Sequence, residues 1–89
     1  PEKAEARYYL RLSLLDKPGV LARVAHVLGQ HQISIASMIQ KEQSRGDYVP
    51  VIILTHSAVE KNFQAALAEI DQMDVVSAKT VRLRIEDFA

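Results

Sequence analysis

The chain has 89 residues, of which 48% are apolar and 25% charged, so it has the size and composition of one globular domain with one core. Its eleven basic residues balance eleven acidic ones, which leaves nonspecific binding to nucleic acid or to an anionic membrane without electrostatic support. The absence of cysteine excludes disulfides, thiolate chemistry and cysteine-based zinc sites, and it agrees with a cytoplasmic location.

The first half of the chain predicts a strand, a helix and a second strand. Residues 1–7 carry mixed charges and suggest a linker or frayed N-terminus, so we place the domain at residues 8–89. Residues 8–15 alternate apolar and polar as a half-buried strand does. A helix then follows the Asp16–Gly19 turn and ends near His31, with Gln32 where a left-handed glycine cap often stands. Residues 33–40 alternate again and predict the second strand.

The second half predicts a hairpin, a helix and a last strand. Residues 42–47 form a polar connection, and residues 48–55 form a nearly continuous apolar strand, which suggests a central position in a sheet. Pro50 cannot donate to a ladder, so we expect it near the strand's start, at a bulge or beyond its neighbour's end. Residues 57–60 have the form of a capping box. The helix after it should bury Val59, Phe63, Ala66, Leu67 and Ile70.

The last strand should run from residue 75 or 76 to about residue 86, after a helix that ends at Met73 or Asp74. Its alternation predicts that Val81, Leu83 and Ile85 face inward, whereas Thr80, Arg82, Arg84 and Glu86 face outward. The whole order is β-α-β-β-α-β. This order predicts an α+β, ferredoxin-like fold, in which a four-stranded antiparallel sheet carries both helices on one face.

The turn at residues 16–21 is the most informative stretch for function. Asp16 is a good N-cap, Pro18 suits the first turn of a helix, and Gly19 allows close approach to the backbone. Free amides at a helix start suit a carboxylate, and Asp16, if it is not used as a cap, could take an ammonium group. Lys17 would add attraction for the carboxylate. A free amino acid carries both charges, although the same features also fit a well-capped turn without a ligand.

Other chemistries find little support. The third strand offers one tyrosine and no basic residue, unlike the stacking strands of an RNA-binding sheet. His26 and His31 are five residues apart on a helix and point in different directions, which makes a poor metal pair. No serine has an evident histidine–acid pairing. We therefore predict a binding module with no catalytic residue, no metal and no cofactor of its own.

Two segments resemble the ACT domain, a small ferredoxin-like regulatory module that is commonly an amino-acid sensor on metabolic enzymes. They are residues 14–21, which read LLDKPGVL, and residues 31–35, which read HQISI. The resemblance implies a ligand site at Asp16, Lys17, Gly19, Val20, Leu21 and Ser34, with Ser34 reaching a site on a second subunit. Asp16 and Ser34 stand where serine-sensing ACT domains carry asparagine, and Leu14 where they carry histidine, so serine is disfavoured as the ligand.

Residues 8–12, 34–42 and 51–56 further resemble the C-terminal ACT domain of homoserine dehydrogenase. This resemblance implies feedback control, with threonine the favoured effector, of an NAD(P)-dependent enzyme in the aspartate pathway. NAD(P) would bind a domain that precedes Pro1. ACT domains commonly pair, so a homodimer or higher assembly is expected. An assembly module without a ligand, or the ACT domain of another enzyme or regulator of amino-acid metabolism, stays open.

Overall fold

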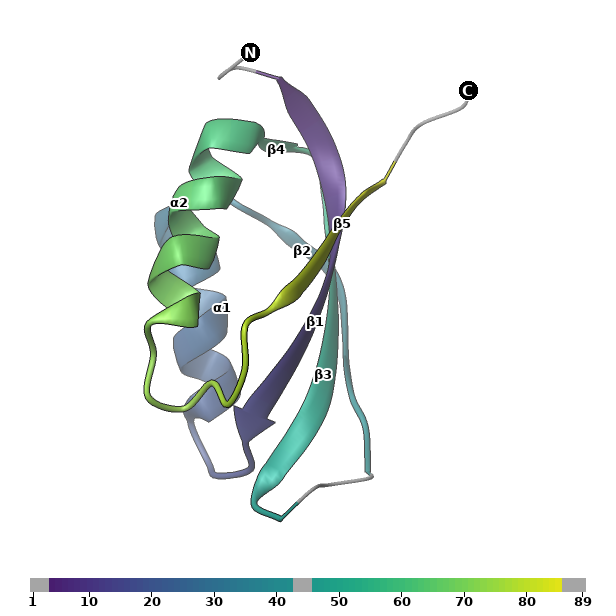
Figure 1. Cartoon of the computed structure of the whole chain (residues 1–89). Coiled ribbons are helices and arrows are strands. Elements are labelled where there is room, and N and C mark those ends of the chain that lie inside the picture. The colour runs from purple at the N-terminus through teal and green to yellow at the C-terminus, as the bar shows by residue number, and fades with distance from the viewer. Residues whose placement is uncertain (1–3, 43–45, 86–89) are drawn as a thin grey trace.

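The computed structural model describes residues 4–42 and 46–85. Two helices pack against one face of an antiparallel sheet, and the opposite face is uncovered (Figure 1). This is the α+β, ferredoxin-like arrangement predicted from the sequence, with one short extra strand. In chain order the elements are β1 (Glu5–Leu15), α1 (Val20–Gln30), β2 (Ile35–Gln40), β3 (Tyr48–Thr55), β4 (Ala58–Val59), α2 (Glu60–Asp71) and β5 (Val81–Ile85).

The strands follow the order β2-β3-β1, and the far side of β1 pairs with both β4 and β5. β3 lies between β2 and β1, so the prediction of a central third strand is confirmed. Pro50 lies opposite Ser13 of β1 and accepts a hydrogen bond from the amide of Lys41, just beyond the end of β2 (3.0 Å). The edge of Pro50 that lacks an N–H therefore faces the end of β2, as expected, and the ladder between β3 and β1 is undisturbed.

Two predicted boundaries near β4, the start of β1 and the start of α2, are wrong. β1 begins at Glu5 instead of residue 8, because Glu5 and Ala6 pair with β4 and Arg7 pairs with β5. Residues 5–7 are thus part of the sheet, while residues 1–3 lie outside the described ranges. The capping box is also wrong. Ala58 and Val59 form β4, and α2 begins at Glu60 without a side-chain cap. The hairpin prediction falls partly on residues 43–45, which the structure does not describe.

The ends of α1 differ from each other in how well they were predicted. Asp16 is not the N-cap and Pro18 lies before the helix, because the N-cap is Gly19, with a left-handed φ of 88°. At the other end Gln32 has a φ of 63°, which confirms the predicted left-handed cap. The amide of Gln32 donates to the Gly29 carbonyl (3.0 Å), and that of Ile33 donates to the Leu28 carbonyl (3.0 Å). These bonds satisfy carbonyls that the helix end leaves unpaired.

The core lies between the helices and the sheet. β1 contributes alternate buried side chains, as predicted, and β3 does the same, although its sequence predicted a continuous apolar run. α2 buries Phe63, Ala66, Leu67 and Ile70 as predicted, whereas Val59 lies in β4 and is only partly buried. The Tyr8 ring stacks on Phe63, with ring centroids 3.7 Å apart. Burial of the Tyr8 hydroxyl raises its pKa, and the nearby Glu60 carboxylate adds to the rise. α2 ends at Asp71, two or three residues before the predicted end at Met73 or Asp74.

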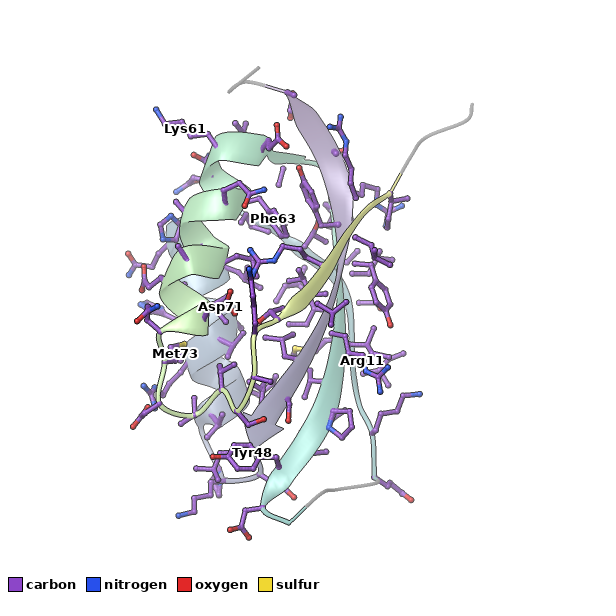
Figure 2. The ribbon with its side chains drawn as sticks, viewed as in Figure 1. Arg11, Tyr48, Lys61, Phe63, Asp71 and Met73 are labelled. Atoms are coloured by element: carbon purple, nitrogen blue, oxygen red, sulfur yellow. The ribbon has the colours of Figure 1, made fainter. Side chains whose placement is uncertain are left out.

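The predicted facing of the last strand is inverted. Val81 and Leu83 are 53% and 58% exposed, whereas Arg82 lies opposite the buried Leu10 and so shares the helix-covered face. The reason is a polar contact at the end of α2. The Asp71 carboxylate accepts hydrogen bonds from the Thr80 amide (3.0 Å) and from the Arg82 guanidinium. Figure 2 shows Asp71 beside α2, on the helix-covered side of the sheet, and Arg11 on the uncovered side.

Candidate functional site

The turn between β1 and α1 is held by three backbone hydrogen bonds. The amide of Asp16 donates to the Asp47 carbonyl (2.7 Å), that of Lys17 to the Leu15 carbonyl (3.0 Å) and that of Val20 to the Lys17 carbonyl (3.3 Å). Together they place Gly19 in the left-handed region that favours glycine. No heavy atom lies within 4 Å of a Cβ built on Gly19. The turn therefore requires glycine for its conformation, and the space beside it is open to solvent.

The start of α1 leaves backbone donors free. Among the described residues, none accepts a hydrogen bond from the amides of Gly19, Leu21 or Ala22. The amide of Val20 is already used within the turn, so Val20 can contribute only its side chain and its position. Free amides at the positive end of a helix dipole favour an anionic group such as a carboxylate.

Asp16 and Lys17 are both exposed, in the turn that leads into these amides. Because Gly19 occupies the N-cap and receives no side-chain cap, the Asp16 carboxylate is not consumed in capping. It is therefore available to a cationic group in the solvent or in a ligand. The site places one acidic and one basic side chain next to free amide donors, which is the complementarity that an α-amino acid requires.

A small hollow lies beside the turn. Its volume is about 20 Å³, which is space for about one water molecule and too little for an amino acid. Nine residues line it: Leu14, Leu15, Asp16, Lys17, Val20, Leu21, Gln40, Val49 and Val51. Gln40, the last residue of β2, was not predicted as a site residue, because only the pairing of β2 with β3 brings it to the turn.

Ser34 is the one predicted site residue that the fold keeps apart from the turn. It precedes β2 and follows the C-terminal end of α1, and its carbonyl accepts a hydrogen bond from the His56 amide (2.9 Å). An 11-residue helix separates it from the turn by about 16 Å along the axis. Ser34 is exposed, but within one chain it does not join Asp16, Lys17, Gly19, Val20 and Leu21.

A second, shallower hollow of about 500 Å³ lies on the outer surface of the helices, between Arg23 and His26 of α1 and Glu69 of α2. The histidines nearby have separate partners: His26 contacts Gln30 (2.8 Å), and His31 contacts Glu69 (3.0 Å). Within residues 4–42 and 46–85, no group of three or more potential metal-ligating side chains was found. Over the same ranges no helix is long and apolar enough to cross a membrane.

The fold and the turn together define a class of protein. The chain belongs to the ACT domain family, whose family model matches residues 8–74. At the level of fold, it superimposes on the ACT domain of a GTP pyrophosphokinase from Chlorobium tepidum with a TM-score of 0.69 and 11% identity, covering 90% of this chain and all of that one.

Its curated relatives point to one group of enzymes. The chain is 53% identical to a homoserine dehydrogenase of Methylobacillus glycogenes over 92% of its own length, and 42% identical to that of Pseudomonas aeruginosa over 98%. A crystal structure of a homoserine dehydrogenase from Thiobacillus denitrificans matches 99% of the chain with 43% identity and a TM-score of 0.86. The chain spans about a fifth of the length of these proteins.

Proposed function

We propose that this chain is the regulatory domain of a homoserine dehydrogenase and that it binds a free amino acid, with threonine the favoured effector. One observation carries the proposal: the amides of Gly19, Leu21 and Ala22 have no acceptor among the described residues, and Asp16, whose carboxylate does not cap the helix, lines the same small hollow as Leu21. The amides suit the α-carboxylate of the ligand, and Asp16 suits its ammonium group. The family of the chain supports the regulatory role, and the names of its relatives support homoserine dehydrogenase as the parent enzyme.

We propose further that a second copy completes the site. The hollow at the turn is too small for an amino acid, and it ends at Gln40 on the edge strand β2. Antiparallel pairing of two β2 strands, with Ile35 opposite the partner's Gln40, would bring Ser34 next to the partner's hollow. The pairing would also cover an unpaired edge, which proteins rarely leave exposed. In this homodimer or higher assembly Ser34 supplies a hydroxyl to the ligand.

Threonine fits the lining better than serine because it has one more methyl group. Val20 and Leu21 present apolar surface beside the turn, and burial of one methyl group contributes about 0.8 kcal/mol. The sequence offers no dinucleotide fingerprint, since its three glycines stand at positions 19, 29 and 46. NAD(P) and catalysis therefore belong to the remaining four-fifths of the parent enzyme, which we place in the cytoplasm.

Thermal unfolding of the chain against a panel of free amino acids tests this proposal. A ligand at a hundredfold excess over its Kd stabilises the folded state by about 2.7 kcal/mol, which raises the Tm of a domain this small by about 10–20 °C. We expect this shift with threonine, a smaller one with serine, and none with threonine in Asp16→Asn. Glu5→Gln, which changes an exposed carboxylate at the opposite end of β1 from the turn, is the matched control and should respond like the parent chain.

A second candidate function rests on the β2 edge. Met38 and Ile39 are 41% and 52% exposed there, which favours pairing of copies even without a ligand. An assembly module of this kind predicts dimers whose Tm is the same with every amino acid. A shift with an amino acid other than threonine would retain the site and replace the effector.

A further inference from the structure

The sheet face opposite the helices is unusually apolar for an exposed surface. Strand pairing places apolar side chains of four strands on this open face, among them Tyr9, Ile39, Ile52, Leu54, Val81, Leu83 and Ile85. Three of them, Ile39, Val81 and Leu83, are more than half exposed. They come from four neighbouring strands, so they form a continuous surface and not scattered single residues. Contiguous apolar surface of this kind marks an interaction site.

The size of the open face limits what can cover it. Strands about 4.8 Å apart and five residues of about 3.3 Å each give a surface of roughly 300 Å², so an interface here buries roughly 600 Å² in total. Interfaces between free proteins need about 1,200–2,000 Å². Contacts between domains of one chain begin at about 600 Å², because the linker keeps both surfaces at a high local concentration.

Charge argues against a second copy on this face. Arg11 lies in the middle of it, opposite Val81 on one side and Ile52 on the other, and none of the described residues forms an ion pair with it. Arg7 follows on the same face, where its guanidinium donates to the Thr55 carbonyl (3.1 Å). A two-fold contact between open faces would set these cations against their own copies. A carboxylate is the complementary group.

We propose that the open face binds another domain of the same polypeptide, through an apolar surface that carries a carboxylate for Arg11. The inference rests on the proposed function, because it takes the chain as one part of a longer enzyme. The size of the face favours a tethered partner, and its charge favours an acidic one. The β2 edge then pairs copies of the domain, while the open face joins each copy to the remainder of its own chain.

Thiol protection tests the proposal. Position 83 on the open face and Ala68, exposed on α2, are changed to cysteine one at a time, in this chain and in the full-length enzyme. This chain has no native cysteine, and in the enzyme the labelled peptide is quantified by mass spectrometry. We expect Leu83→Cys and Ala68→Cys to react alike in this chain. In the full-length enzyme, position 83 should react at least tenfold more slowly, and position 68 as before.

Arg11→Glu and Arg11→Lys then test the charge. In the full-length enzyme Arg11→Glu should restore labelling at position 83, whereas Arg11→Lys should keep it protected. Equal labelling of positions 83 and 68 in the enzyme would overturn the proposal. So would dissociation of assemblies of this chain by Leu83→Glu, since the open face would then join copies. Threonine binding by this chain is measured separately, so failure of the effector proposal is distinguishable from failure of this one.

Discussion

Replacing Asp71 by asparagine should destabilise the domain substantially. The Asp71 and Arg82 side chains are only 17% and 25% exposed, so their contact is largely shielded from water. Asparagine keeps an acceptor for the Thr80 amide but loses the charge that faces Arg82. Loss of one partner of a fully buried ion pair costs about 3–5 kcal/mol, and a charged hydrogen bond contributes about 1.5–3 kcal/mol. Because the Arg82 guanidinium can rehydrate in part, we expect a loss of about 2 kcal/mol.

The pH dependence gives a second, independent check. Burial alone would raise the pKa of Asp71, but hydrogen bonds from Thr80 and Arg82 and the charge of Arg82 outweigh it and lower that pKa. The carboxylate therefore stabilises the fold fully above its unfolded pKa of about 3.9, and this contribution is lost as the pH falls through the lower folded value. The difference in unfolding free energy between the parent chain and Asp71→Asn should be constant at neutral pH and shrink in acid.

Urea unfolding between pH 7 and pH 2.5 measures both effects. Asp74→Asn is the control, because Asp74 is 87% exposed and lies 3.6 Å from Arg23, an arrangement that contributes little. It should change the unfolding free energy by less than about 0.5 kcal/mol. If Asp71→Asn behaved like this control at pH 7, or if its deficit persisted unchanged in acid, the assigned role of the Asp71–Arg82 contact in holding β5 would be wrong.

Two further predictions concern the core and the glycines. The buried Tyr8 hydroxyl has no hydrogen-bond partner among the described residues, so Tyr8→Phe, which keeps the stack on Phe63, should raise the unfolding free energy by about 1 kcal/mol. Tyr8→Ala should lower the unfolding free energy by about 3–5 kcal/mol. Urea unfolding measures both variants, and a clear loss of stability in Tyr8→Phe would contradict this reasoning. Gly19→Ala should cost about 1–2 kcal/mol because the φ of 88° is strained for alanine. Gly29→Ala, at an exposed position in α1 with open space around it, should instead raise the unfolding free energy by about 0.5–1 kcal/mol. Equal Tm shifts for Gly19→Ala and Gly29→Ala would show that the backbone conformation of Gly19 does not require glycine.

Local pattern was sufficient for most of the fold. The alternation in β1 predicted which of its side chains would be buried, the continuous apolar run predicted the central position of β3, and the apolar stripes predicted both helices. The capping-box pattern at residues 57–60 failed because strand pairing competed with it. Ala58 and Val59 gain a ladder with Glu5 and Ala6, and the amide of Glu60 donates to the Ala4 carbonyl (2.7 Å) instead of to a side-chain cap. A side-chain N-cap stabilises a helix by only about 1 kcal/mol, so these tertiary contacts outweigh it.

The last strand shows a different limit. In the alternation of Val81, Arg82 and Leu83, apolar side chains point to one face and cationic ones to the other, but the pattern does not say which face meets the helices. Hydrophobicity favours burying valine and leucine, whereas the contact with Asp71 requires Arg82 on the helix-covered side. Asp71 lies eleven residues earlier, at the end of α2, so this requirement becomes visible only once the helix is packed.

In the candidate site, too, residues that are close together in the sequence could be predicted and residues far apart could not. The turn residues Asp16, Lys17 and Gly19 are consecutive or nearly so, and their chemistry could be predicted because one short stretch positions them. Gln40 reaches the turn only through the sheet, and Ser34 would reach it only from another subunit. A site that is complete within one chain would hold its ligand regardless of assembly. A site divided between a turn and a partner's edge strand makes ligand binding and pairing depend on each other, and such mutual dependence is what a regulatory domain requires.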